Sequence, residues 1–126
     1  MADGVQLEVL IIRYTEHSLV ADIRRGVLLR GGFVCGEPVT LDSMPERQFD
    51  RVLLLGVGAN LERAREVRII IESRYPGVPL TIITHHVDLD RISFFKGSAT
   101  VLMMDVADAE LIDAVAHGAK QTAGPI

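Results

Sequence analysis

The stretch from Asp50 to Val67, DRVLLLGVGANLERAREV, constrains the fold of this chain more than any other. An apolar run that begins at Val52 leads into a GVG turn and then directly into an amphipathic helical pattern. Such a run is typical of a parallel strand that is covered on both faces. In open α/β folds, ligands bind at the carboxyl edge of the sheet. We therefore expect Leu55–Asn60 to lie at that edge, and it carries no acid, nucleophile or metal ligand.

Strand and helix patterns alternate along the rest of the chain. The predicted strands are Val5–Ile12, Phe33–Glu37, Arg51–Leu55, Leu80–Thr84 and Ala99–Met104. Helices are predicted from Ser18 to Gly31, after Asn60, between Asp88 or Asp90 and Gly97, and over Ala107–His117. Only a helix of one or two turns fits between Asp42 and Asp50. Crossovers of this length require parallel strands, so we predict a flavodoxin-like, doubly wound α/β sandwich with strand order 2-1-3-4-5 and a reduced second helix.

The apolar residues of the predicted helices indicate which faces are buried. In the first helix, the expected buried stripe is Leu19, Val20, Ile23, Val27 and Leu28, with Asp22, Arg24 and Arg25 facing outward. In the last helix, Leu111, Ala114 and Val115 are expected to face inward.

Charge and cysteine content exclude several classes of function. The 126 residues carry a formal net charge of −4, which gives no general attraction to nucleic acid or to an anionic membrane. The only cysteine, Cys35, excludes an intramolecular disulfide and fits a reducing compartment. No apolar run is long enough to span a membrane, and the first residues do not form a secretion signal. We expect a cytoplasmic, single-domain chain.

Three further stretches carry a family resemblance: EHSLVADIRRGVLLRGGFVCGE, RYPGVPLTIITHH and GSATVLMMDVADAELIDAVA. They resemble the receiver domains of two-component response regulators, particularly those of the LuxR/FixJ type. The resemblance runs from about Leu7 to Lys120 and implies the CheY-like form of the fold. It implies a receiver-like domain over residues 1–120, with residues 121–126 as a tail or the start of a linker to an output domain.

The resemblance also implies where the phosphorylation chemistry of that family would lie. The phosphoacceptor aspartate is matched by Leu55 and the lysine after the fifth strand by Met104, whereas the hydroxyl after the fourth strand is retained as Thr84. Leucine has no nucleophilic oxygen, and a thioether cannot replace an ammonium group against a phosphoryl oxygen.

The pair of metal-binding acids allows two alignments. Counting from the end of the first strand gives Arg13 and Tyr14, and counting back from HSLV gives Thr15 and Glu16. At most one carboxylate remains in either alignment, so we expect no Mg²⁺, no other cofactor and no enzymatic activity. The prediction is a degenerate pseudo-receiver that does not depend on phosphorylation.

Such a module would act by forming a homodimer or by binding a partner protein, and would contact DNA only through a downstream output domain. The expected interaction face consists of apolar residues of the last two predicted helices: Leu89, Ile92, Phe94, Phe95, Leu111 and Val115.

An alternative function is the binding of a small molecule or nucleotide at the glycine-containing turn. Gly56, Gly58 and Asn60 could bring backbone N–H groups to an anion at a helix N-terminus, with Thr84 nearby. Leu61 occupies the position at which a dinucleotide fingerprint needs its third glycine, and no Lys-Ser/Thr pair follows for a P-loop. The simpler interpretation is a strand-to-helix turn capped by Asn60.

Overall fold

The computed structural model describes residues 6–14, 18–56, 61–84 and 99–117. Its five strands are β1 (Glu8–Arg13), β2 (Val34–Cys35), β3 (Arg51–Leu55), β4 (Leu80–Thr84) and β5 (Thr100–Met103). Neighbouring strands are parallel, and the order in the sheet is β2-β1-β3-β4-β5. The predicted fold class and strand order are confirmed.

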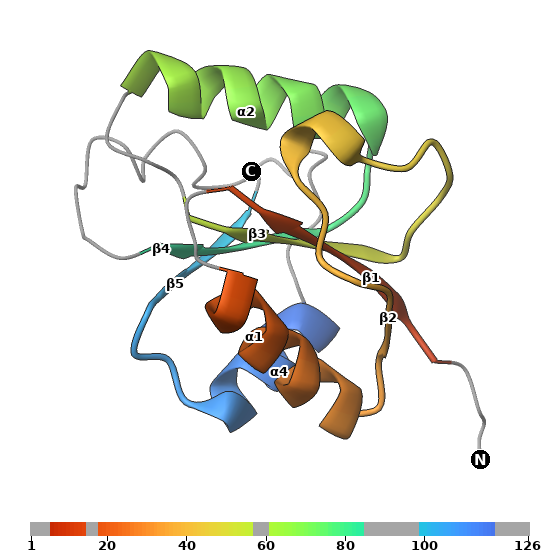
Figure 1. The fold of residues 1–126 in the computed structure, drawn as a ribbon, viewed down its shortest axis with the longest axis vertical. Helices are drawn as coiled ribbons and strands as arrows, with labels where there is room; N and C mark the ends of the chain where they lie inside the picture. The colour runs from red at the N-terminus through yellow and green to blue at the C-terminus, as the bar shows by residue number, and fades with distance from the viewer. Residues whose placement is uncertain (1–5, 15–17, 57–60, 85–98, 118–126) are drawn as a thin grey trace.

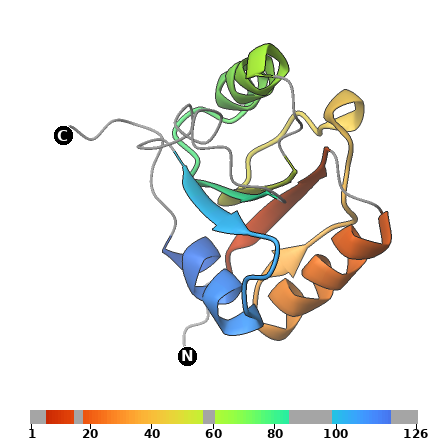
Figure 2. The ribbon, with the colours of Figure 1, turned by 90° about the vertical axis from the view of Figure 1, so that its left-hand side faces the viewer.

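The helices lie on both faces of this sheet (Figure 1). They are α1 (Ser18–Arg30), the 3₁₀ turn η1 (Leu41–Ser43), α2 (Leu61–Arg74) and α4 (Asp108–Ala116). Helix α2 and η1 lie on one face, and α1 and α4 lie on the other (Figures 1 and 2). The reduction of the second helix is confirmed, since η1 is the helical segment between β2 and β3. The helix predicted between Asp88 or Asp90 and Gly97 lies outside the described residues.

Alternation along the strands divides the interior into two cores. Val52 and Leu54 of β3 belong to the core under α2, and Leu53 and Leu55 belong to the core under α1 and α4. All four side chains are at most 1% exposed. A strand that is buried on both faces has no need for polar alternation, which explains the uninterrupted apolar run.

The buried face of α1 differs from the prediction. Ala21, Arg24, Val27 and Leu28 are buried, whereas Leu19 and Ile23 are 64% and 57% exposed. The helix is therefore rotated about its axis relative to the predicted stripe. Burial of Arg24 is tolerated because its guanidinium Nη2 donates a hydrogen bond to the carbonyl oxygen of Met104 at 2.7 Å.

Gly31 allows α1 and α4 to lie close together. A Cβ atom at this position would come within 2.9 Å of Cγ1 of Ile112 in α4. Gly32 follows with a φ of +94°, in the region that favours glycine and that commonly ends a helix. The pair thus ends α1, as predicted, and leaves room for its neighbour.

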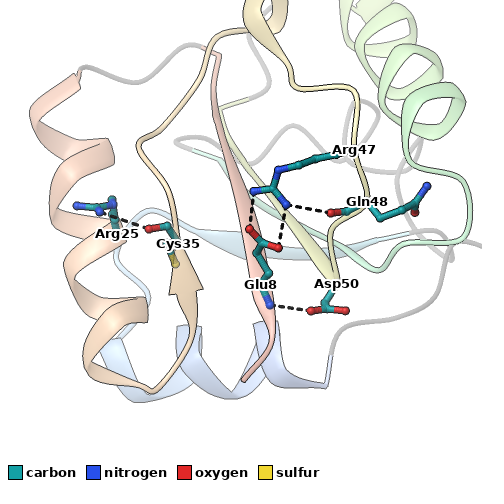
Figure 3. A network of polar contacts seen from close by, with 6 residues as sticks. All are labelled: Glu8, Arg25, Cys35, Arg47, Gln48 and Asp50. Atoms are coloured by element: carbon teal, nitrogen blue, oxygen red, sulfur yellow. Dashed lines mark hydrogen bonds and ion pairs between the residues drawn. The ribbon is translucent and has the colours of Figure 1, made fainter. Parts of the chain in front are cut away.

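A polar network holds the loop that replaces a second helix (Figure 3). The guanidinium of Arg47 donates to both carboxylate oxygens of Glu8, and Oδ2 of Asp50 accepts a hydrogen bond from the Glu8 N–H at 2.8 Å. Arg47 also lies 4.2 Å from the ring centroid of Phe49, which packs edge to face against Tyr75. The amino end of β1 is therefore tied to the segment that enters β3.

Arg51, the first residue of β3, caps the carboxyl end of α4. Its Nε donates to the carbonyl oxygen of Val115 at 2.9 Å, and its Nη2 donates to that of Ala116 at 3.0 Å. The last carbonyl groups of a helix have no partner within it, and they lie at the negative end of the helix dipole. The guanidinium group of Arg51 supplies hydrogen-bond donors for these carbonyl groups and a positive charge at this end of the helix.

Among the described residues, no helix is long and apolar enough to cross a membrane.

We expect Arg51→Met to lower the free energy of unfolding by about 1–3 kcal/mol, because it removes charge-assisted hydrogen bonds and leaves carbonyl groups without partners. The measurement is chemical denaturation. Arg30→Met is the matched control, because Arg30 is exposed and, among the described residues, its one ion pair is with Asp108 at 3.7 Å, so a change within about 0.5 kcal/mol is expected. Equal effects of the two substitutions would contradict the capping role.

The hydrogen bonds from Arg47 lower the pKa of the Glu8 carboxyl below its ordinary value. This ion pair therefore stabilises the fold fully above the ordinary pKa of glutamate, and the stabilisation is lost as the pH falls through the lower pKa of the folded state. We expect wild-type protein to lose stability over this acidic range more steeply than Glu8→Gln, measured by denaturation at a series of pH values. Parallel pH profiles would show that the pair contributes nothing.

Candidate functional site

The carboxyl ends of three strands meet where the sequence places the degenerate phosphorylation pocket. In the sheet register, Arg13 of β1 lies beside Leu55 of β3, and Leu55 lies beside Ile83 of β4. Thr84 is the last residue of β4 and pairs with Met103 of β5. The topology therefore brings Arg13, Leu55 and Thr84 to one edge, as predicted.

Leu55 is closed off from solvent at this edge. Its side chain is 0% exposed and belongs to the aliphatic cluster that includes Ile11, Leu53 and Ile83, with Met104 packed against it. The positions that the resemblance assigns to the acceptor and the lysine thus share one apolar core. Neither side chain can attack or bind a phosphoryl group.

The backbone after Leu55 has a conformation that requires glycine. Gly56 has a φ of +95°, a region in which a side chain is strained. Its N–H donates to the carbonyl oxygen of Ile83 at 2.7 Å, and the Leu55 carbonyl oxygen accepts from the Tyr14 N–H at 3.0 Å. The Gly56 N–H is thus committed to the neighbouring strand rather than turned toward an anion.

The candidate nucleotide-binding turn is described only at its first residue. Gly58 and Asn60 lie outside the described residues, as does Glu16 of the acid pair.

Thr84 and Leu55 lie on different faces of the sheet. Strand alternation places Thr84 on the same face as Leu80 and Ile82, which belong to the core under α2. Leu55 belongs to the core on the opposite face. Thr84 is 7% exposed. The retained hydroxyl group is therefore buried and is separated by the sheet from the acceptor position.

Arg24 is a residue of this edge that the sequence analysis placed on the solvent face. It is 8% exposed, and its bond to the Met104 carbonyl links α1 to the connection between β5 and α4. A cation therefore lies near Met104, the position that the resemblance matches to a lysine, but it binds main-chain oxygen. Sequence alone had no signal for this role, because arginine on an amphipathic helix usually faces water.

The prediction that Leu111 and Val115 belong to an exposed interaction face is wrong. Leu111 and Val115 are 0% and 1% exposed, because the apolar stripe of α4 packs on the sheet beside α1. Their prediction as inward-facing residues is confirmed. Leu89, Ile92, Phe94 and Phe95 lie outside the described residues. The large apolar residues that are exposed in the described parts are Leu19, Ile23, Leu29, Val34 and Ile69.

Cys35 does not offer a nucleophile. Its thiol is buried in the core under α1, and this burial raises its pKa to about 11, so the reactive thiolate is rare at neutral pH. The part of the chain that the structure describes also contains no cluster of three or more histidine, cysteine or acidic side chains that could hold a metal ion.

No protein-family model and no curated protein matches the sequence. Among solved structures, the chain is similar to a response regulator receiver protein from Sinorhizobium medicae WSM419. The two share 19% identity with a TM-score of 0.64, over 86% of this chain and 92% of that one.

A CheY-like response regulator receiver domain protein from Methanospirillum hungatei JF-1 shares 16% identity with a TM-score of 0.69, over 89% of this chain and 92% of its own. A transiently phosphorylated "switch" in bacterial signal transduction shares 20% identity with a TM-score of 0.56, over 89% and 94% of the two chains. Together with the strand order and the helices on both faces, these similarities establish that the chain has the CheY-like fold of response regulator receiver domains.

Proposed function

We propose that this chain is an atypical receiver domain of the LuxR/FixJ-like type that acts in signal transduction or transcription control without being phosphorylated. The observation that carries the proposal is the burial of Leu55 in an aliphatic core at the position that matches the phosphoacceptor. The module is a regulatory protein that binds a partner protein or a second copy of itself. It performs no catalysis, and DNA would be contacted only through an output domain if one is joined to it.

Three features of the edge support independence from phosphate. The acceptor position lacks an oxygen nucleophile, and the lysine position carries the thioether of Met104. The acid pair keeps at most one carboxylate in either alignment, and in one of them Arg13, which lies beside Leu55 in the sheet, takes the place of an acid. Mg²⁺ prefers several oxygen ligands, including carboxylates. A cation at Arg13 opposes binding of such an ion rather than assisting it.

Incubation with acetyl phosphate and Mg²⁺ should leave the intact mass of the wild-type protein unchanged, whereas an aspartyl phosphate would add about 80 Da. A receiver domain that retains its aspartate serves as the positive control under the same conditions. A stable phosphoryl adduct on this chain would refute the proposal. The Leu55→Asp variant should not be phosphorylated under the same conditions, since the lysine and the acid pair are also missing.

We expect Leu55→Asp to lower the free energy of unfolding by about 3–5 kcal/mol, because it places a carboxylate without a partner in an apolar core. Leu55→Met is the matched control, since it conserves volume and should cost less than about 1.5 kcal/mol. Denaturation curves of the two variants provide the measurement. If Leu55→Asp is as stable as Leu55→Met, the position is open to water and is still a pocket.

A further inference from the structure

The short η1 turn leaves a groove beside α2. The groove has a volume of about 510 Å³, and its walls come from η1 and the residue after it on one side and from the carboxyl half of α2 on the other. The residues that matter here are Leu41, Asp42, Met44, Ile69, Ile70 and Arg74. Both walls lie on the face of the sheet opposite α1 and α4 (Figures 1 and 2).

The floor of the groove is apolar and continuous with the core. Met44 is buried in the core under α2, and Leu41 and Ile70 are packed against it. Ile69, by contrast, is 54% exposed at the groove. Burying an isoleucine side chain contributes about 1.5–3 kcal/mol relative to leaving it in water, so covering this residue is favourable.

The two walls carry opposite charges. Asp42 is exposed on the η1 wall, and Arg74 is exposed in the last turn of α2. Nη1 of Arg74 donates to the Met44 carbonyl oxygen at 3.3 Å, which leaves other guanidinium N–H groups for further contacts. Within the described residues, neither Asp42 nor Arg74 has an ion-pair partner.

This arrangement is complementary to itself. A two-fold axis repeats each contact, so an acid on one wall and a base on the other make two equivalent ion pairs when two copies meet. In such a pair, the exposed Ile69 of each copy would lie against the apolar groove of the other. A different protein would need its own matching acid, base and apolar residue, whereas a second copy supplies them without further assumption.

We propose that this groove is the contact surface of a symmetric homodimer, with Ile69 at its centre and Asp42 of each copy paired with Arg74 of the other. The inference rests on the proposed function for its biological meaning, since it names the partner through which the module acts. It replaces the buried Leu111 and Val115 as the apolar contact surface. The net charge of −4 on each copy opposes association and is screened at physiological salt.

The test is the oligomeric state of the full chain, measured by sedimentation velocity over a range of concentrations at physiological salt. Wild type should dimerise from its 13.8 kDa monomer. Ile69→Lys should shift it to monomer, whereas Ile23→Lys, at the exposed apolar position on α1, should leave the dimer unchanged and serves as the matched control.

Charge reversal tests the two-fold pairing itself. Asp42→Arg alone places two bases together and Arg74→Asp alone places two acids together, so each variant should be monomeric. Their equimolar mixture should form a heterodimer, because both ion pairs are then restored, and the double variant should form a homodimer for the same reason.

A monomeric wild type at all concentrations would overturn the inference, as would a dimer that is lost with Ile23→Lys but kept with Ile69→Lys. A mixture of the charge-reversal variants that stays monomeric would refute the pairing of Asp42 with Arg74. None of these results bears on phosphorylation, which the intact-mass experiment decides separately.

Discussion

The structure depends on the burial of β3 from Val52 to Leu55. Its side chains from Val52 to Leu55 face two different cores in turn, and each core is closed by helices on one face of the sheet. Burial on both faces requires all backbone hydrogen bonds of the strand to be made within the sheet, which its position between β1 and β4 provides. The apolar end of this strand also places a buried leucine at the carboxyl edge of the sheet.

Much of the fold could be predicted because it follows from periodicity. The strands, their order and the shortened second crossover were all indicated by apolar runs, turn residues and segment lengths. The ends of elements were less certain: β2 is only Val34–Cys35, because Gly36 and Pro38 follow and proline cannot donate to a ladder. Gly31 could be recognised from the sequence as the end of a helix, but its close approach to Ile112 of α4 could not.

The candidate site was predictable in position but not in detail. Arg13 and Leu55 lie side by side because β1 and β3 are neighbours in the sheet, and this follows from the predicted strand order. The burial of Arg24 depends on how α1 is rotated about its axis, and the pattern of apolar residues predicted this rotation wrongly. The five apolar residues at helical spacing in α1 predicted a single buried stripe. In the structure, α1 packs against both the sheet and α4. The buried face of α1 therefore includes Ala21 and Arg24, whereas Leu19 and Ile23 are exposed.

Arginines from other elements hold the carboxyl end of helix α4 and the segment that precedes this helix. Arg24 of α1 binds the carbonyl oxygen of Met104 ahead of the helix, and Arg51 of β3 binds those of Val115 and Ala116 at its end. Both arginines recognise main-chain oxygens, which every residue type supplies. The outward residues of this helix can therefore change through evolution without moving it. The position of α4 on the sheet thus does not depend on the side chains that this helix shows to solvent.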